Sequence, residues 1–247
     1  MAIFEARNLH KRFGEQVVLE QINLAFEEGC LSGIMGPNGA GKTTCFNVLT
    51  GQYRPDRGKV IFDGEDITGS SPEAVVRKGI SRSFQIMNLF DEYSALENVV
   101  IAQPQVRSKG LSVWHALDAN SEAQDRAKDA LSRVGLAGHE HVNAKAMPYG
   151  QRRALEIGVA LATEPKILFI DEPTAGLGAD AISRLADLIR ELKTTTTIVM
   201  IEHDMRFLFA LADRISVIHW GQVITEGTPA ELKENPWVQR SNLGALA

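Results

Sequence analysis

Residues 36 to 43 read Gly36-Pro37-Asn38-Gly39-Ala40-Gly41-Lys42-Thr43, and they set the architecture of the chain. They fit the pattern G-x-x-x-x-G-K-[ST], in which glycines let the backbone bend so that its N–H groups point inward at a phosphate. An apolar run over residues 31–35 precedes the motif, and a helical pattern follows it. A strand, a glycine loop and a helix N-terminus in this order predict a polyphosphate site, with Lys42 reaching the β and γ phosphates and the Thr43 hydroxyl binding Mg²⁺.

A second candidate feature is an acidic pair at the end of another apolar run. Residues 167–170 are Ile-Leu-Phe-Ile, and Asp171 and Glu172 follow directly. A buried parallel strand delivers such residues to its carboxyl edge, where ligands bind in sheets of this kind. Alone, the pair is more often a solvated strand end. The phosphate loop upstream favours Asp171 as the holder of Mg²⁺ and its waters, and Glu172 as the group that positions or deprotonates the attacking water.

A histidine follows a third apolar run. Residues 197–201 lead into Glu202-His203-Asp204, at the same expected edge of the sheet. An imidazole there can hydrogen-bond the γ phosphate and hold the water and the carboxylate in register. A lone histidine at a strand end is usually structural, so His203 is a candidate because of its neighbours.

The fourth candidate is a helix start at residues 147–151, Met-Pro-Tyr-Gly-Gln. Proline can precede or open a helix, and glycine exposes backbone N–H groups, so the stretch predicts a second anion site. The alternative is an ordinary helix N-terminus. Since one polyphosphate does not need two such sites in one chain, we expect the second to serve a neighbouring subunit.

Composition limits the classes of protein that the chain can belong to. Its 247 residues are 44% hydrophobic, and 26 Lys and Arg against 31 Asp and Glu give a net charge of -5, too acidic for general nucleic-acid binding. The two cysteines, Cys30 and Cys45, form no disulfide framework, which fits a reducing cytosolic compartment. The N-terminus lacks a secretory signal, and no run approaches about 18 apolar residues, so we expect any link to a membrane to go through a partner.

Periodicity predicts an α/β chain with a helical insertion. Residues 1–35 are β-rich, and helix replaces strand between residues 95 and 142, where residues 122–134 have helical spacing. After residue 151 strands and helices alternate, which predicts a mainly parallel sheet covered by helices. The expected strands are residues 17–26, 31–35, 59–62, 167–170, 197–201 and 215–219, and the expected later helices are residues 152–162, 181–192 and 205–212.

These motifs together resemble the ATP-binding subunit of an ABC transporter, from Leu9 to Gly244. The phosphate loop, Gln85 in Ser-Phe-Gln, the stretch 147–151, Ile-Asp-Glu-Pro-Thr at 170–174 and His203 occur in that family's order and approximate spacing. The resemblance implies a P-loop NTPase (RecA-like) core with a mainly parallel sheet, an N-terminal antiparallel β subdomain and an inserted α-helical subdomain. It also implies a single ABC ATP-binding domain, with residues 1–94 and 151–247 as the core and residues 95–150 as the helical signature subdomain.

The resemblance further implies a sandwich dimer in which ATP and Mg²⁺ lie between the phosphate loop of one subunit and the signature helix of the other. Glu172, His203 and Lys42 are then the expected catalytic residues, and Thr43, Gln85 and Asp171 the metal-binding ones. Phe13 falls where the family stacks an aromatic ring on adenine, with a core phenylalanine as the alternative. The full expected set of ATP contacts is Phe13, Gly36, Pro37, Asn38, Gly39, Ala40, Gly41, Lys42, Thr43, Thr44, Gln85, Tyr149, Gly150 and Gln151.

Two segments depart from the family's usual residues. In the signature, Pro148 replaces a serine and Tyr149 a glycine, which removes a hydroxyl that would bind the γ phosphate across the dimer and leaves the backbone N–H groups near Gly150. After the acidic strand, Gly178 stands where the family has an intersubunit Asp. Asp180 would substitute only if the loop shifts.

A finer likeness is to importers of branched-chain and other hydrophobic amino acids, carried by residues 149–157, 202–205 and 226–236. It implies a cytoplasmic ATPase that is peripheral on the inner face of the membrane through transmembrane permease subunits. The other implied partners are a second ATP-binding subunit, identical or a sister chain, and indirectly a solute-binding protein. No nucleic acid is expected. Residues 86–90 are expected to line the groove for the permease, with a core role as the alternative for Leu89 and Phe90. The alternative functions are a lipid or other-substrate system and a soluble ABC protein of DNA repair or translation.

Overall fold

The computed structural model describes residues 2–83, 89–104, 106 and 121–240. Gln85, residues 86–88 and most of the segment 103–120 therefore lie outside the described residues. Within the described ranges, no helix combines the length and the apolar character needed to span a membrane.

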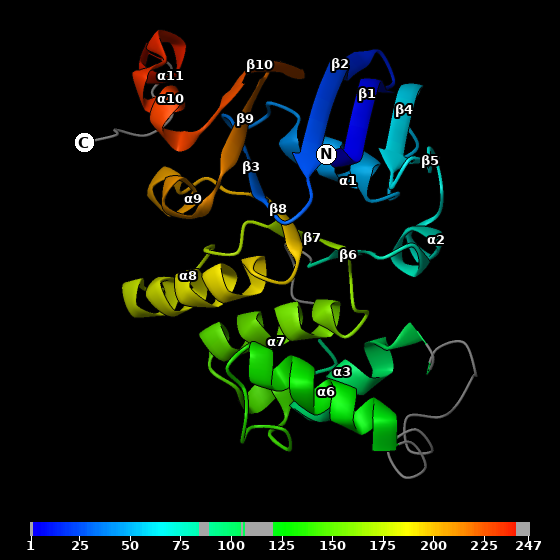
Figure 1. Cartoon of the computed structure of the whole chain (residues 1–247), viewed down its shortest axis with the longest axis vertical. Helices are drawn as coiled ribbons and strands as arrows, with labels where there is room; N and C mark the ends of the chain where they lie inside the picture. Colours follow the sequence, from blue (N-terminus) through cyan, green and yellow to red (C-terminus); the bar gives the residue numbers. More distant parts are fainter. Residues whose placement is uncertain (1, 84–88, 105, 107–120, 241–247) are drawn as a thin grey trace.

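An antiparallel sheet forms one end of the molecule, as expected for the N-terminal region. Its strands lie in the order β2-β1-β4-β5, and in Figure 1 they are blue to cyan. The bounds are β1 Ala2–Phe13, β2 Gln16–Glu27, β4 Arg57–Phe62 and β5 Glu65–Asp66. Alternation along β2 places one face against the core and leaves the other to solvent.

A second sheet, of six strands, runs through the middle of the molecule in the order β10-β9-β3-β8-β7-β6. Five of its strands are parallel, and only β10 pairs antiparallel, with β9. All residues of β3, β7 and β8 are buried, which explains why these strands are mostly apolar. The bounds are β3 Leu31–Met35, β6 Ile80–Arg82, β7 Ile167–Asp171, β8 Thr197–Ile201, β9 Arg214–His219 and β10 Gln222–Gly227.

Helices cover the parallel sheet, and the insertion forms a helical layer of its own, drawn in green in Figure 1. In this layer α3 and α6 pack on each other and on α7. The N-terminus of α3 is fixed by a capping box between Ser94 and Glu97. The helices of the insertion and its surroundings are α2 Pro72–Arg77, α3 Ala95–Ala102, α6 Ser121–Arg133 and α7 Tyr149–Leu161; the others are α1 Lys42–Leu49, α8 Ala179–Lys193, α9 Met205–Leu211, α10 Pro229–Glu234 and α11 Pro236–Arg240.

Two hydrophobic clusters meet at the parallel sheet. Phe169 of β7 faces the β subdomain and contacts the rings of Phe4, Phe26 and Phe46 at centroid distances of 5.1–6.3 Å. The other face of the sheet packs against the helices, including α7 and α8. Packing on both faces fixes β7, and therefore fixes the direction in which its carboxyl end points.

Candidate active site

The carboxyl ends of three neighbouring strands bring the predicted motifs together. The strands β3, β8 and β7 are adjacent and parallel in the sheet. The phosphate loop follows β3, the segment Glu202-His203 follows β8, and Asp171-Glu172 ends β7. Segments far apart in the sequence therefore form one edge, as the alternation predicted.

The phosphate loop has a backbone that only glycine can adopt at two points of close approach. A Cβ on Gly36, whose φ is 154°, would lie 2.0 Å from the carbonyl oxygen of Ile218. A Cβ on Gly41, whose φ is 99°, would lie 2.8 Å from the carbonyl oxygen of Val18. Gly41 also precedes the first residue of α1, so the loop delivers the chain into a helix N-terminus, as a phosphate cradle requires.

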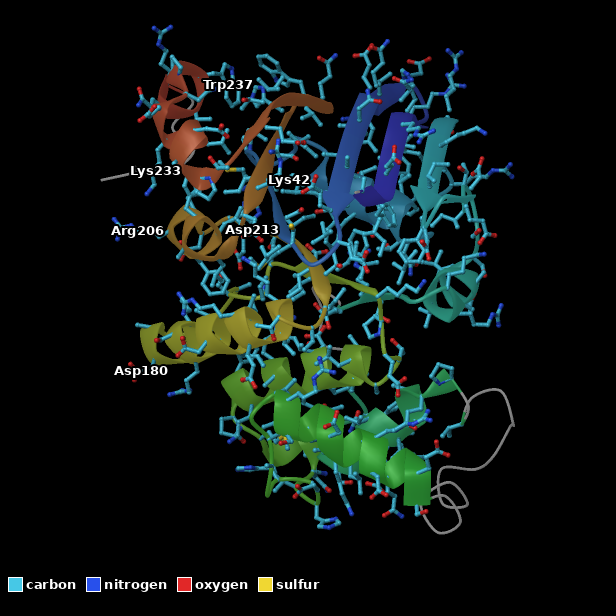
Figure 2. The ribbon with its side chains drawn as sticks, in the orientation of Figure 1. Lys42, Asp180, Arg206, Asp213, Lys233 and Trp237 are labelled. Carbon is cyan, nitrogen blue, oxygen red and sulfur yellow. The ribbon has the colours of Figure 1, made fainter. Side chains whose placement is uncertain are left out.

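Lys42 folds back over this loop. Its side chain is buried, and Nζ donates hydrogen bonds to the carbonyl oxygens of Gly36 at 2.9 Å and Pro37 at 3.0 Å. Burial lowers the pKa of the Lys42 ammonium, while the carboxylates Glu172 and Asp171 oppose this effect. Figure 2 shows Lys42 in the interior and Asp180 at the margin of the molecule. The ammonium is thus held inside the curve of the loop, within the field of the two carboxylates.

Asp171 is fully buried with one oxygen paired and one not. Its Oδ2 accepts a hydrogen bond from Nη2 of Arg82 at 2.6 Å. Its Oδ1 is also buried, and no group in the described part of the chain hydrogen-bonds to it. Burial raises the pKa of the Asp171 carboxyl, with Arg82 opposing the rise. A buried acceptor without a partner is unusual and indicates a missing donor or ion.

Glu172 and His203 form the contact that the sequence pattern implied. His203 Nε2 lies 2.7 Å from Glu172 Oε1, and the His203 side chain is 42% exposed against 15% for Glu172. Glu172 has a φ of 44°, a conformation that non-glycine residues rarely adopt, and its N–H donates to the carbonyl oxygen of Ile201 at 2.9 Å. Such backbone strain gathers at functional sites, because the surrounding structure must hold it.

Two residues that sequence reasoning did not select hold this edge together. Glu202 is buried; its Oε1 accepts from the N–H of Thr174 at 2.8 Å and its Oε2 from the N–H of His203 at 2.8 Å. Arg153 of α7 donates from Nη2 to the carbonyl oxygens of Asp171 at 2.6 Å and Glu172 at 3.1 Å. The position of Glu202 directly before His203 was the sequence feature that could have identified Glu202. Nothing in the local sequence pairs Arg153 with β7.

The signature segment lies at an exposed helix start. The helix α7 begins at Tyr149, three residues before the expected position, with Pro148 as a cap residue that makes no side-chain cap hydrogen bond. Tyr149 is exposed, and its hydroxyl donates to the carbonyl oxygen of Ala175 at 3.2 Å. Gly150 and Gln151 follow, both half-buried. The helix α7 therefore still begins at this segment, although Pro148 and Tyr149 replace the usual residues of the signature.

The remaining candidates occupy different surroundings. Phe13 is 45% exposed and meets Tyr53 edge-on at a centroid distance of 5.4 Å, so the alternative that it is a core residue is wrong. In the loop, Asn38, Gly39 and Thr43 are exposed and Thr44 is half-buried. Asp180 lies in the first turn of α8 and is exposed.

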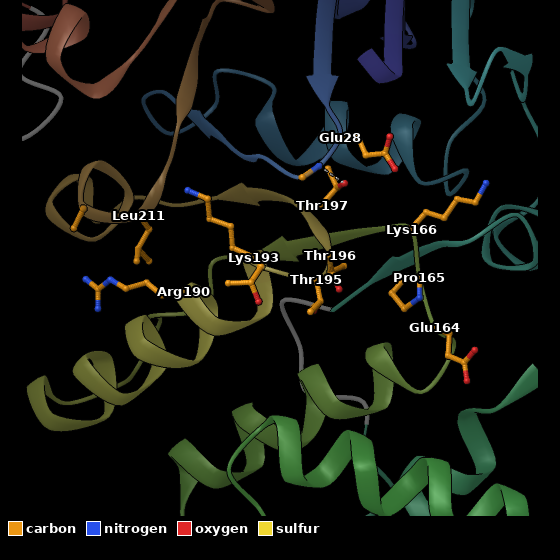
Figure 3. A pocket seen from close by; sticks show the side chains of 13 residues that line it. Glu28, Glu164, Pro165, Lys166, Arg190, Lys193, Thr195, Thr196, Thr197 and Leu211 are labelled. Atoms are coloured by element: carbon orange, nitrogen blue, oxygen red, sulfur yellow. Dashed lines mark hydrogen bonds between the residues drawn. The ribbon is translucent and has the colours of Figure 1, made fainter. Parts of the chain in front are cut away.

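Two large cavities have linings that exclude the phosphate loop, Glu172 and His203. One, of about 950 Å³, lies between α2, β6, α3 and α7, and its lining includes Thr50, Arg82, Leu89 and Glu156. The other, of about 920 Å³, lies at the amino ends of β7 and β8 (Figure 3). Lys166, Arg190 and Lys193 line the second cavity, and each is paired with a carboxylate. The second cavity therefore does not resemble a phosphate site.

A glycine loop between a buried strand and a helix, with an acidic pair on a neighbouring parallel strand, defines a P-loop nucleotide-binding protein. A family model described as ABC transporter matches residues 19–175. The chain therefore belongs to the ABC transporter family, and it is the ATP-binding part of such a system.

Relatives of known name match over nearly the full chain. The high-affinity branched-chain amino acid transport ATP-binding protein LivG of Escherichia coli (strain K12) is 38% identical over 249 residues, 98% of each chain. The protein of the same description named BraF, from Pseudomonas aeruginosa, is 39% identical over 98% of each chain. The lipopolysaccharide export system ATP-binding protein LptB of Acidithiobacillus ferridurans is 32% identical, over 98% of this chain and 97% of its own.

Solved structures agree with the fold. The ADP conformation of MJ1267, an ATP-binding cassette of an ABC transporter, has a TM-score of 0.86 at 30% identity, covering 99% of both chains. The dimeric post-hydrolysis state of the cassette MJ0796, bound to ADP and Pi, has a TM-score of 0.76 at 26% identity, covering 92% of this chain and 98% of its own. Cassettes similar to this chain thus bind nucleotide, and one of them is a dimer.

Proposed function

We propose that this chain is the ATP-hydrolysing motor subunit of an importer for branched-chain or other hydrophobic amino acids. The observation that carries the ATPase assignment is the Glu172–His203 contact of 2.7 Å, at the ends of β7 and β8, the two strands that lie next to β3 on one side of the sheet. The relatives named for branched-chain amino acid transport are 38–39% identical to this chain, and the lipopolysaccharide export protein is 32% identical. This difference supports amino acids, rather than lipopolysaccharide, as the transported substrate. One ABC ATP-binding domain, with its core in residues 1–94 and 151–247 and its signature subdomain in residues 95–150, carries this function.

The triphosphate binds along residues 36–44. Lys42 exchanges the carbonyl oxygens of Gly36 and Pro37 for phosphate oxygens, which are better acceptors because they are charged. The exposed ring of Phe13 stacks on the adenine; stacking of this type is worth about 1–3 kcal/mol in single-stranded nucleic-acid complexes.

The donor set fits a magnesium ion beside the phosphates. The buried Oδ1 of Asp171 has no partner among the described residues, and Thr43, the second residue of the helix that follows the loop, is exposed. Hard cations take such oxygen ligands and retain several waters, and Gln85 is the third candidate ligand. When bound, Mg²⁺ neutralises charge on the phosphate oxygens.

Glu172 orients the attacking water and accepts its proton, and His203 holds Glu172 in place before ATP binds and hydrogen-bonds the γ phosphate once ATP is bound. The 2.7 Å contact between them fixes the carboxylate before the substrate arrives, which reduces the reorganisation needed during reaction. Glu202 supports the pair by accepting hydrogen bonds from both loops.

A second ATP-binding subunit completes the site through the helix start at residues 149–151. The exposed N-terminus of α7 presents N–H groups and partial positive charge to an anion outside its own chain. The known dimeric cassette supports this arrangement. The cavity beside α2, β6, α3 and α7 has room for a helix of a permease subunit, which supports a location at the inner face of the membrane.

The assignment is tested with Glu172→Gln, Lys42→Ala and the control Glu164→Gln, the same change at the opposite edge of the sheet. Glu172→Gln is expected to bind Mg-ATP and sediment as a stable dimer with no turnover, because it keeps the shape but not the proton acceptor. Lys42→Ala is expected to lose ATP binding, and Glu164→Gln to behave as the unaltered chain. Unchanged turnover of Glu172→Gln would refute the role of Glu172.

Importer function is tested separately, by removing the protein from cells and measuring uptake of labelled leucine. Loss of leucine uptake, restored by the unaltered chain and not by Lys42→Ala, is expected. Normal leucine uptake with a defect in the cell envelope would favour the lipopolysaccharide type of system instead.

A further inference from the structure

Arg82 is a half-buried cation that joins three separate segments of the core. It ends the edge strand β6, which runs parallel to β7 with Arg82 beside Phe169. Its Nη2 donates to Oδ2 of Asp171 at 2.6 Å, and the side chains are 10% and 0% exposed. Its Nη1 donates to Oδ1 of Asn47 at 2.5 Å and to Oγ1 of Thr50 at 3.2 Å.

These contacts fix the guanidinium in one place. Asn47 and Thr50 belong to or end α1, the helix that opens on the phosphate loop, and the Thr50 hydroxyl itself donates to the carbonyl oxygen of Phe46 at 2.7 Å. The guanidinium also lies over the Phe46 ring, 5.2 Å from its centroid. The guanidinium is planar and its Nη1 is held by residues of α1, so its Nη2 can reach Asp171 in only one geometry.

The pairing has a consequence for the second oxygen of Asp171. Because Arg82 holds Oδ2, rotation of the carboxylate would break this ion pair, and Oδ1 keeps its orientation with no hydrogen bond from the described residues. A carboxylate that serves a metal is normally oriented by a second group in this way, and loss of the orienting partner typically costs 10–100-fold in metal affinity or activity.

We propose that Arg82 is a positioning residue that orients Asp171 toward the magnesium ion of the nucleotide site and ties that orientation to helix α1. The inference rests on the proposed function, since it requires Mg-ATP to bind at this edge. It assigns to Arg82 a role toward the metal rather than toward the phosphates. Arg82 therefore affects the part of nucleotide affinity that depends on magnesium.

The test is calorimetric titration of ATP, once with excess Mg²⁺ and once with EDTA, for the unaltered chain, Arg82→Met and Arg82→Lys. The quantity compared is the ratio of the two affinities. Arg82→Met is expected to reduce this ratio by about tenfold or more, with little change in the affinity measured in EDTA. Arg82→Lys keeps the charge but loses the fork, so it is expected to show an intermediate loss.

Arg190→Met is the matched control, because Arg190 forms an exposed ion pair with Asp187 at 2.7 Å on the far side of α8. It is expected to keep the ratio of the unaltered chain. Should Arg82→Met fail to fold, Arg82→Lys decides the question, since it leaves Asp171 with a cation nearby.

The possible results separate the two levels of the argument. No ATP binding by the unaltered chain in either buffer would overturn the proposed function itself. Normal binding with an unchanged ratio in the folded Arg82 variants would overturn only the role of Arg82. An equal loss of affinity with and without magnesium would also overturn it, because a merely structural role predicts that result.

Discussion

Two adjacent arginines of α7 offer a sharp comparison between a buried and a surface ion pair. Arg153 pairs with Glu156 at 2.5 Å, and both side chains are 5% exposed. Arg152 pairs with Asp91 at 2.6 Å, and the side chains are 18% and 54% exposed. Removing one partner of a buried pair costs about 3–5 kcal/mol, because the other charge is left without compensation. An exposed pair is worth about 0–1 kcal/mol.

We therefore expect Arg153→Met to lower the free energy of unfolding by about 3–5 kcal/mol, and Arg152→Met by about 1 kcal/mol or less. For a chain of this size the first loss corresponds to a fall in Tm of roughly 6–20 °C, at about 2–4 °C per kcal/mol. Urea unfolding, followed by circular dichroism with m values compared between variants, measures both.

A double variant checks the cause. Arg153→Met with Glu156→Leu removes the buried charge as well as its partner, so it is expected to be more stable than Arg153→Met alone. It will not regain the full stability, because Arg153 also donates to the carbonyl oxygens of Asp171 and Glu172. Equal stability of Arg153→Met and Arg152→Met, or a double variant less stable than the single one, would refute the reasoning.

Two further predictions concern the phosphate loop and the helix behind it. Gly36→Ala places a Cβ 2.0 Å from the Ile218 carbonyl oxygen and is expected to lower the free energy of unfolding by more than about 3 kcal/mol. Gly39→Ala places a Cβ with nothing within 4 Å, so it is expected to lower the free energy of unfolding by only about 1–2 kcal/mol, because of its positive φ. Comparable urea midpoints of the two variants would contradict this. Burial raises the pKa of the Cys45 thiol to about 12 from 9.0, so its thiolate fraction at pH 8 falls roughly a thousandfold. Alkylation of Cys45 by iodoacetamide is therefore expected to be negligible in the folded chain at pH 8 and to accelerate about tenfold per pH unit below about 12. In urea the alkylation is expected to be rapid. Mass spectrometry after digestion measures the alkylated fraction of Cys45.

The parts of the fold that were predictable from the sequence share one physical property. The strands β3 and β8 begin and end where expected, because strands buried on both faces are mostly apolar, and the apolar stretch stops at Gly36 after β3 and at Glu202 after β8. The strands β6 and β10 were not predicted. The first has only three residues, and the second alternates between exposed and half-buried positions at the edge of the sheet, so neither carries a strong hydrophobic pattern.

The same limit applies to the site. Parallel strand ends made the meeting of Lys42, Glu172 and His203 predictable, because topology alone places them at one edge. The ion pair between Arg82 and Asp171 joins residues 89 positions apart, and it depends on which strand lies at the edge beside β7. Hydrogen bonds of this kind depend on how the strands pack, and no repeating pattern of residues in the sequence predicts them.

The central claim is that ATP binds between the phosphate loop of one subunit and the signature helix of another. A crystal structure of Glu172→Gln with Mg-ATP tests it most directly, because this variant is expected to hold the nucleotide unhydrolysed. The account predicts a triphosphate along residues 36–44, with the N-terminus of α7 from a second subunit against the γ phosphate. Nucleotide bound elsewhere, or at a phosphate loop that faces solvent with no second subunit, would contradict it.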